Sequence, residues 1–369
     1  MGGGTLVLFP LMWLLRWGVG AVAAEDAVDF VGFHGAFVIN NPHFAVTYLL
    51  FYRSARERLF GDALPPLQRA RYLVAGFVVP VVLAVWAGRA LQTGSPRTMG
   101  SLIQLMFLLV GWHYAKQGFG ILTVLSARRG YSWSGLERTM ALGHCFAAWA
   151  YAWASPADPG RLVQEKGVVY TTVAHPAGLE RATLVAFLAS ALALVVVLAR
   201  RWLTERRLPP LGPLAAFLIT LWLWTVYTTL DRLMMYFIPA LHAIQYLYFV
   251  WLLRRNEARA AEGPPTFGKP ASVRLLSLAV SAIGLGWLLF RGLPAFLDAR
   301  LALHAAPGAG PPALGETPYL AAIYVFVNIH HYFMDHVIWR RENPETRYLR
   351  ADPVPSAEPD AGLPAASRT

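Results

Sequence analysis

Histidines recur in four separate hydrophobic stretches of this chain, each near the point where the middle of a lipid bilayer would fall. An ionisable ring in hydrocarbon is costly without a partner, so such residues mark functional sites in membrane proteins. One shared site explains several histidines at one depth more economically than unrelated accidents do. We therefore predict a buried metal site. Its ligands are His43 in NNPHFAVTYLL, His113 in VGWHYAKQG, His242 in PALHAIQYLYF, and His330 and His331 in FVNIHHYFMDH.

Polar side chains stand at helical spacing around these histidines. His331 and Asp335 are four residues apart and share one helix face, so the carboxylate can ligate beside His331 or orient its ring. We expect Asp335 to take part in catalysis together with two residues that follow candidate ligands by one turn, Gln117 and Tyr246. Two further histidines, placed nearer the outer and inner faces, complete the predicted ligand set: His34 and His336.

The composition indicates a membrane protein. Hydrophobic residues make up 56% of the 369 residues and charged residues 14%, with a mean hydropathy of +0.44, whereas soluble domains have roughly 45–50% and about 25%. Apolar runs of about 20 residues, long enough to cross a hydrocarbon core of roughly 30 Å, recur along the chain. We predict an all-α, polytopic transmembrane bundle of about ten helices, or nine if the first is a cleaved signal peptide. The segments are 5–23, 29–52, 70–91, 99–126, 137–155, 181–199, 211–230, 232–253, 273–292 and 317–339.

The charges alternate between successive connections. Lys and Arg number 32 against 21 acidic residues, and the basic residues gather after every second predicted span. This is the positive-inside pattern, and it places both termini in the cytoplasm of a multi-pass cell-membrane protein. The surplus of basic residues is thereby explained without nucleic acid as a partner. Residues 1–339 form the predicted transmembrane domain, and residues 340–369 a polar, disordered cytoplasmic tail.

The cysteine content limits the metal chemistry. Cys145 is the one cysteine, which excludes an intramolecular disulfide and a cysteine-based zinc or iron–sulfur site. The metal must then be held by imidazole and carboxylate, a donor set that suits iron, with zinc and copper as alternatives.

The isolated histidines on several helices resemble the Brp/Blh carotenoid dioxygenases, which are helical bundles with histidines around one iron. The chain is also similar to the membrane desaturase–hydroxylase group. It lacks that group's HxxxH and HxxHH clusters at cytoplasmic helix ends, since its one cluster is HHYFMDH at 330–336, within a helix. The resemblance implies an oxidoreductase, an oxygenase, hydroxylase or desaturase, that acts on a lipid or isoprenoid and draws on an electron donor.

Three other classes of protein stay open. Two histidines on facing helices at one depth could hold haem for electron transfer. Intramembrane His and Asp could relay protons in a transporter, although the sequence has no inverted repeat. In a non-enzymatic assembly protein the histidines would only join helices through hydrogen bonds. We assign that last role to His144, which lies in another helix.

Overall fold

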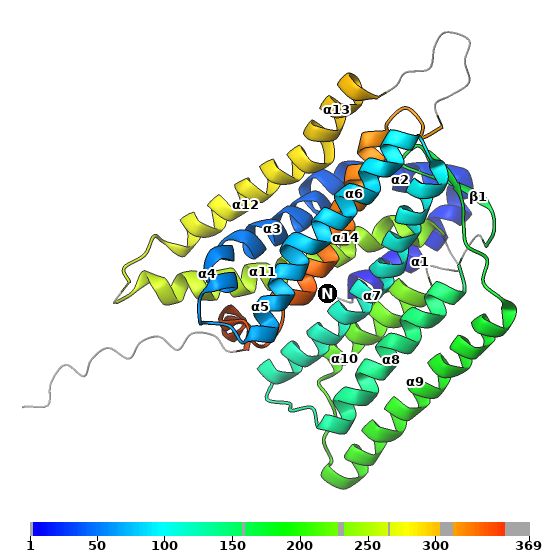
Figure 1. Cartoon of the computed structure of the whole chain (residues 1–369). Helices are drawn as coiled ribbons and strands as arrows, with labels where there is room; N and C mark the ends of the chain where they lie inside the picture. Colours follow the sequence, from blue (N-terminus) through cyan, green and yellow to red (C-terminus); the bar gives the residue numbers. More distant parts are fainter. Residues whose placement is uncertain (1–2, 157–158, 228–231, 265, 303–312, 351–369) are drawn as a thin grey trace, which may run out of the picture.

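The computed structural model is almost entirely helical and describes residues 3–156, 159–227, 232–264, 266–302 and 313–350 (Figure 1). The first part of the chain forms α1 (Gly3–Val19), α2 (Ala21–Val38), α3 (Asn40–Tyr52), α4 (Ala55–Phe60), α5 (Pro66–Leu73), the π-helical turn η1 (Val74–Val78) and α6 (Val79–Thr93). The middle part forms α7 (Pro96–Arg128), α8 (Gly135–Ala154), β1 (Leu162–Glu165), β2 (Val168–Thr171), α9 (Ala177–Glu205), α10 (Leu211–Leu218) and the π-helical η2 (Ile219–Val226). The last part forms α11 (Arg232–Glu262), α12 (Ala271–Trp287), the π-helical η4 (Leu288–Gly292), α13 (Leu293–Leu301), α14 (Pro318–Ile338), the 3-10 turn η5 (Pro344–Thr346) and α15 (Arg347–Arg350).

Helix α14 lies in the middle of the bundle. It contacts α3, α6 and α7, while α9 and α12 run along opposite outer edges (Figure 1). A large apolar core joins α14 to α6 and α7, and a second core joins α7 to α8, α9 and α10. The segments that carry the candidate ligands therefore meet at the centre of the bundle, although they are far apart in the sequence.

The predicted hydrophobic segments are mainly helical in the described residues, so the all-α class is confirmed. The predicted segment 5–23 is divided, because Gly20 has a φ of 86° and separates α1 from α2. The predicted segment 29–52 is not a single helix, because the chain breaks at Ile39 between α2 and α3. Pro42 explains the break: its nitrogen cannot donate to the carbonyl of Val38, and its ring would collide with that carbonyl in a continuous helix. The new helix that starts at Asn40 carries His43 in its first turn.

Three helical stretches are long and apolar enough to cross a membrane among the described residues: Pro66–Thr93, Ala177–Glu205 and Ala271–Leu301. Each of these helices contains an apolar stretch of 18 residues, and only 22%, 11% and 17% of the residues in these stretches are buried, in the order given. The helices therefore expose apolar side chains on the outside of the bundle. The helices that carry the candidate ligands do not belong to this set. Their histidines and neighbouring polar residues lie in the interior of the bundle, and these residues lower the mean hydropathy of the helices.

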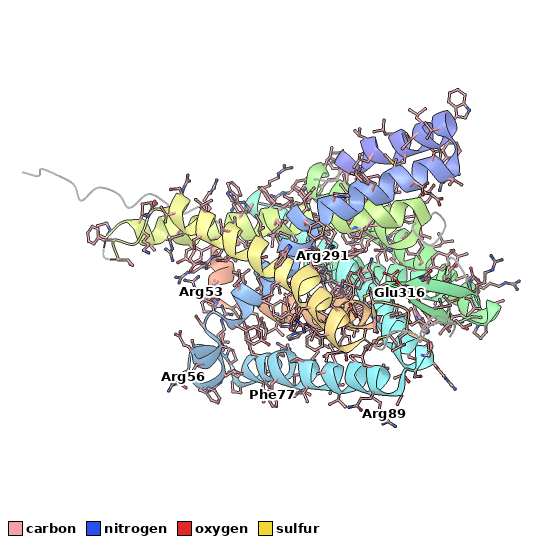
Figure 2. All side chains as sticks on the ribbon, turned by 90° about the horizontal axis from the view of Figure 1, so that it is seen from above. Arg53, Arg56, Phe77, Arg89, Arg291 and Glu316 are labelled. Atoms are coloured by element: carbon pink, nitrogen blue, oxygen red, sulfur yellow. The ribbon has the colours of Figure 1, made fainter. Side chains whose placement is uncertain are left out.

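The surface along α5 and α6 has an apolar middle and charged ends. Figure 2 shows Arg56 at one end of the row formed by α4, α5 and α6 and Arg89 toward the other, with Phe77 between them on the outer side. The Phe77 side chain is 64% exposed. Such a belt of exposed apolar groups between charged ends suits a lipid bilayer.

A short β-hairpin interrupts the helical pattern and was not predicted. Strands β1 and β2 pair antiparallel, with Leu162 opposite Thr171 and Glu165 opposite Val168. Lys166 and Gly167 form the two-residue turn with φ of 49° and 86°, the left-handed conformations that a tight hairpin turn requires. The hairpin packs on α7 at Gly100, where a Cβ atom would lie 2.5 Å from the Cβ of Tyr170.

The expectation of disorder from residue 340 onward is wrong for its first part. Residues 340–350 fold back on the bundle through η5 and α15. Asn343 is buried and donates to the carbonyls of Val337 and Ile338, and Glu345 accepts from Arg58 at 2.6 Å. The two hydrogen bonds from Asn343 cap the end of α14, because they satisfy carbonyls that the helix itself leaves without donors. Residues 351–369 lie outside the described residues.

Candidate metal centre

Four buried histidines from four different helices meet in one cluster at the centre of the bundle. Each offers one ring nitrogen, and these nitrogens all lie within 4.8 Å of one another. Neighbouring rings have centroids 4.4–5.0 Å apart. The members are His43 of α3, His113 of α7, His242 of α11 and His331 of α14.

Several ring nitrogens of this cluster have no hydrogen-bond partner. Both nitrogens of His43 and both nitrogens of His331 are buried without one, as is Nδ1 of His242. A buried polar atom without a partner costs about 1–3 kcal/mol, so a native site rarely leaves five of them together. Imidazole nitrogens bound to one ion at about 2.0–2.1 Å lie at most about 4.2 Å apart. A small inward shift of the rings would therefore let them share one metal ion.

Asp335 lies at the edge of the cluster, four residues after His331 in α14. Its Oδ2 atom is 3.6 Å from Nε2 of His331 and 3.7 Å from Nε2 of His113. Its Oδ1 atom accepts hydrogen bonds from the hydroxyl of Tyr246 at 2.7 Å and from Nε1 of Trp339 at 3.3 Å. Oδ1 of Asp335 is thus fixed by hydrogen-bond donors, while Oδ2 faces two histidines. A carboxylate in this arrangement can orient the rings of metal-bound histidines or bind the metal itself.

Tyr246 and Gln117, which we expected at the site, lie in its surroundings. The Tyr246 hydroxyl binds Asp335 and lies 2.7 Å from the hydroxyl of Thr47, and its ring centroid is 4.6 Å from that of His43. Gln117 donates to the side chain of Gln245 at 2.8 Å and to the backbone carbonyl of His242 at 3.4 Å, so it joins α7 to α11 beside the cluster. Its catalytic role stays a prediction.

His330 does not point into the cluster, although we expected it there. Its Nε2 donates to the carbonyl of Ala75 at 2.9 Å, and its Nδ1 lies 3.0 Å from the hydroxyl of Tyr48. The carbonyl can only accept, so the proton is on Nε2 and Tyr48 donates to Nδ1. Ala75 belongs to the π-helical turn η1. His330 therefore joins α14 to α3 and η1, while its neighbour His331 faces the other way.

The other two predicted ligands, His34 and His336, are also absent from the cluster. His34 is exposed on α2, with Nδ1 2.9 Å from the carbonyl of Phe30. His336 lies one turn too far along α14, where its Nε2 is 3.2 Å from Arg340 and its ring packs on Trp112. Neither side chain reaches the centre, because one lies beyond the break at Ile39 and the other on a different face of α14.

His144 has the structural role that we expected. Its Nδ1 lies 2.8 Å from the hydroxyl of Ser190, its Nε2 accepts from the indole of Trp222 at 3.2 Å, and its ring stacks on Phe187. Both nitrogens have partners, in contrast to those of His43 and His331. His144 therefore joins helices through its hydrogen bonds, whereas His43 and His331 have ring nitrogens that a metal ion could bind.

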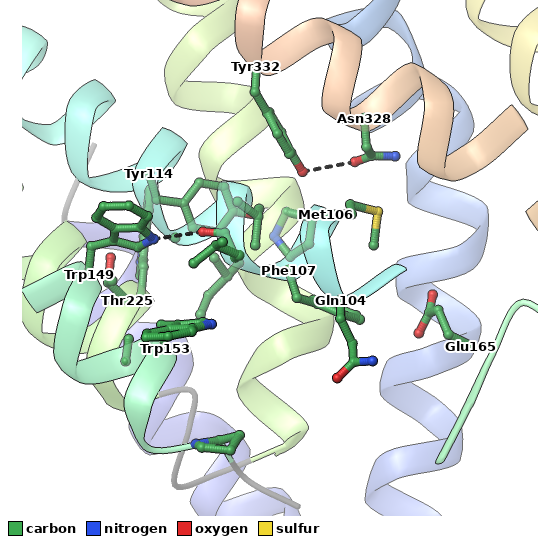
Figure 3. Close-up of a pocket in the computed structure, with 18 of the residues that line it drawn as sticks. Gln104, Met106, Phe107, Tyr114, Trp149, Trp153, Glu165, Thr225, Asn328 and Tyr332 are labelled. Atoms are coloured by element: carbon green, nitrogen blue, oxygen red, sulfur yellow. Dashed lines mark hydrogen bonds between the residues drawn. The ribbon is translucent and has the colours of Figure 1, made fainter. Parts of the chain in front are cut away.

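A cavity of about 370 Å³ reaches from the cluster to the β-hairpin. Its inner end is lined by His43 and His242, and its walls are mostly aromatic and aliphatic. Figure 3 shows Tyr332 and Asn328 of α14 on one side of this pocket and Trp149 and Trp153 of α8 on another. Its other wall residues at the inner end include Tyr114, Phe44 and Trp224. This size and lining are typical of sites that bind small apolar molecules.

Thr47, which shares a helix face with His43, and Trp339, whose place at the site we did not predict, both donate to Oδ1 of Asp335. Thr47 follows His43 by one helical turn, so its place on the same face was readable from the spacing. Trp339 follows Asp335 by four residues, so spacing also places these two side chains on one face of the helix, and the indole donates to Oδ1 of Asp335.

No protein-family model matches this chain, and comparisons with curated proteins and with solved structures gave no match.

Proposed function

We propose that this protein is a polytopic membrane metalloenzyme with both termini in the cytoplasm. The three exposed apolar helices, the apolar belt around Phe77 and the alternation of basic connections support the membrane location. The helices that carry the histidines would cross the membrane inside this outer layer. Their polar side chains would then be shielded from lipid by the apolar helices around them.

The metal would be held by His43, His113, His242 and His331, with Asp335 beside them. The observation that carries this proposal is the set of buried ring nitrogens without partners, above all those of His43 and His331. We assign iron as the metal, since imidazole with carboxylate suits iron that keeps positions open for other ligands, and a cavity adjoins the site. Zinc and copper accept the same donors and are the alternatives.

The reaction that fits is the oxidation of a lipid or isoprenoid by dioxygen. In a hydroxylation one oxygen atom enters a C–H bond, and the other leaves as water with two protons and two electrons from a reductant. Iron supplies the activation of dioxygen when it is bound. The chain's own residues bind the apolar substrate against His43 and His242, exclude water from the cluster, and hold Asp335 in place through Tyr246 and Trp339.

The electron donor would approach from the side of the bundle that carries α15. A second pocket of about 160 Å³ lies there, lined by Trp339 and by arginines that pair with two glutamates of the same lining. The pairs are Arg53 and Arg254 with Glu257, and Arg58 with Glu345. The Trp339 indole touches both this pocket and Asp335, and its ring centroid is 5.5 Å from that of Tyr246. Three arginines against two glutamates give this pocket a small surplus of positive charge beside the aromatic pair, which suits docking of an acidic reductant.

Haem is less well supported than a single ion. Nε2 of His113 and Nε2 of His242 lie 3.0 Å apart. Two axial histidines on opposite faces of a haem would hold their nitrogens about 4 Å apart, twice a metal–nitrogen bond, with a porphyrin between the rings. The four rings contact one another directly, which leaves no space for a macrocycle among them.

Elemental analysis by mass spectrometry tests the proposal on protein purified in mild detergent, together with an optical spectrum. We expect close to one iron per chain and no Soret band. Zinc or copper at the same stoichiometry would keep the site and change the metal. Protein without metal, isolated under conditions that retain metal in other membrane enzymes, would favour a transporter or an assembly protein and overturn the proposal.

A further inference from the structure

The end of the cavity away from the metal centre is covered by the β-hairpin, and an acidic side chain faces inward there. In β1 the half-buried residues are Val163 and Glu165, which alternate with exposed neighbours. Their partners across the hairpin, Tyr170 and Val168, are buried. Side chains of paired strand residues lie on the same face, so Glu165 points toward the cavity with an otherwise apolar set.

The carboxylate of Glu165 has few partners among the described residues. Its contact among the described residues is an ion pair with the adjacent Lys166 at 3.7 Å, and no hydrogen bond to its oxygens is present there. The Lys166 ammonium also lies 4.8 Å from the centre of the Tyr324 ring. The Glu165 side chain is 26% exposed at the cavity lining, so its oxygens can exchange water for a hydrogen-bond donor that a ligand brings. Glu165 is thus placed to accept a hydrogen bond from a ligand that enters the cavity.

Helix α7 gives the length of the cavity. Gln104 lines the hairpin end and precedes His113 of the metal centre by nine residues on the same helix, which is about 13 Å at the rise of an α-helix. The Oε1 atom of Gln104 accepts from the backbone of Val173 at 2.8 Å and so fixes the chain that leaves the hairpin against α7. Figure 3 shows Gln104 and Glu165 at the same part of the pocket, away from Tyr332.

We infer that the cavity selects an amphiphile whose polar end is a hydrogen-bond donor, a hydroxyl or an amine, held by Glu165. Its apolar body, about 13 Å long, lies along α7 between the aromatic walls and ends at His43 and His242. A substrate that ends in a carboxylate or phosphate is repelled by Glu165. This inference rests on the proposed function in one respect: the apolar end of the ligand is the end that lies next to the metal.

Photo-crosslinking tests the head-group preference on the full chain in lipid nanodiscs. Three probes carry the same dodecyl chain with a diazirine at its far end and differ in the head group, which is an amine, an alcohol or a carboxylate. The readout is labelling of peptides from α3 and α11 that line the inner end of the cavity. In the unaltered protein we expect the amine and the alcohol to label these peptides at least about tenfold more than the carboxylate, the ratio that one hydrogen bond to a charged group supports.

Substitutions at Glu165 make the test specific. Glu165→Gln should bring the three probes to within about twofold of one another, and Glu165→Lys should reverse the order in favour of the carboxylate. Glu316→Lys, at an exposed acid outside the cavity lining, is the matched control and should leave the preference unchanged. Equal labelling by all three probes in the unaltered protein would overturn the inference. A preference that both Glu165 variants retain would do the same.

Metal content, measured on the same samples, keeps the two proposals apart. A head-group preference that depends on Glu165 in protein without metal supports the recognition site and contradicts the metalloenzyme. Iron-loaded protein with no head-group preference contradicts the recognition site and leaves the metal centre intact.

Discussion

Nε2 of His113 and Nε2 of His242 lie 3.0 Å apart in the buried centre of the bundle, although the two residues are 129 positions apart in the chain. Two neutral imidazoles can share one hydrogen bond at this distance, and two protonated ones would repel each other in a medium of low dielectric constant. The same spacing suits two neighbouring ligands of one ion. The contact between α7 and α11 therefore depends on what occupies the space between the rings.

Replacing any one cluster histidine by alanine should remove the metal. His43→Ala, His113→Ala, His242→Ala and His331→Ala each delete a ligand. We expect metal content to fall below about a tenth of that of the unaltered protein, because losing even an outer partner of a metal site costs roughly tenfold or more in affinity. Mass spectrometry on purified protein measures it, with membrane expression as the reference.

His144→Ala is the control for these substitutions. It removes a buried histidine whose nitrogens both have partners, so we expect metal content to stay unchanged while stability falls by about 1–2 kcal/mol. Metal loss in this variant as large as in His113→Ala would mean that the cluster is not the site.

Asp335→Asn should weaken metal binding without abolishing it. The amide keeps the shape of the side chain but loses the charge beside His113 and His331, and we expect roughly 10–100-fold lower affinity. Tyr246→Phe removes a donor to the same carboxylate and should lower the affinity by a smaller factor. Titration of metal-depleted protein measures both, and unchanged affinity in Asp335→Asn would exclude the carboxylate from the site.

The neighbours His330 and His331 should behave differently. His330→Gln loses hydrogen bonds to Tyr48 and to the carbonyl of Ala75, which should lower the free energy of unfolding by about 1–3 kcal/mol and leave metal content unchanged. His331→Gln should lose the metal. Thermal unfolding in detergent and metal analysis of both proteins decide the matter, and equal metal loss in the two would contradict the assignment.

Gly286→Ala should disturb the metal centre from a distance. A Cβ atom at Gly286 would lie 2.8 Å from the backbone carbon of Asn41, so α12 must move away from the start of α3, where His43 lies. We expect lower thermal stability and weaker metal binding. Gly284→Ala, in the same helix with open space around it, is the matched control and should stabilise the helix by up to about 1 kcal/mol. Similar behaviour of the two variants would argue against this contact.

Reporter fusions test the proposed topology. Fusions after Arg58, Arg129, Arg207, Arg255 and Arg341 should report the cytoplasm, and fusions at Ser95, Lys166 and Glu316 the opposite side, because the basic connections stay inside. Accessibility of the reporter on each side is the measurement. If two or more fusions report the side opposite to the one predicted, the histidines do not lie at a common depth in the membrane.

The sequence by itself determined that most of the chain is helical, since this follows from local hydropathy and from the spacing of apolar residues along a helix. It also identified Asp335 from its spacing to His331. Those properties depend on neighbours within a few residues of the chain.

Only the tertiary structure decided which face of each helix meets the others. His330 and His331 have the same depth, but successive residues point about 100° apart around a helix, so packing against η1 turned one away and left the other in the cluster. The hairpin and Glu165 also escaped prediction, because four-residue strands are too short to stand out among apolar helices, and Glu165 acquires its place only through contacts with α7 and α14. A shared centre is a property of contacts between distant segments, and hydropathy along one chain carries no information about them.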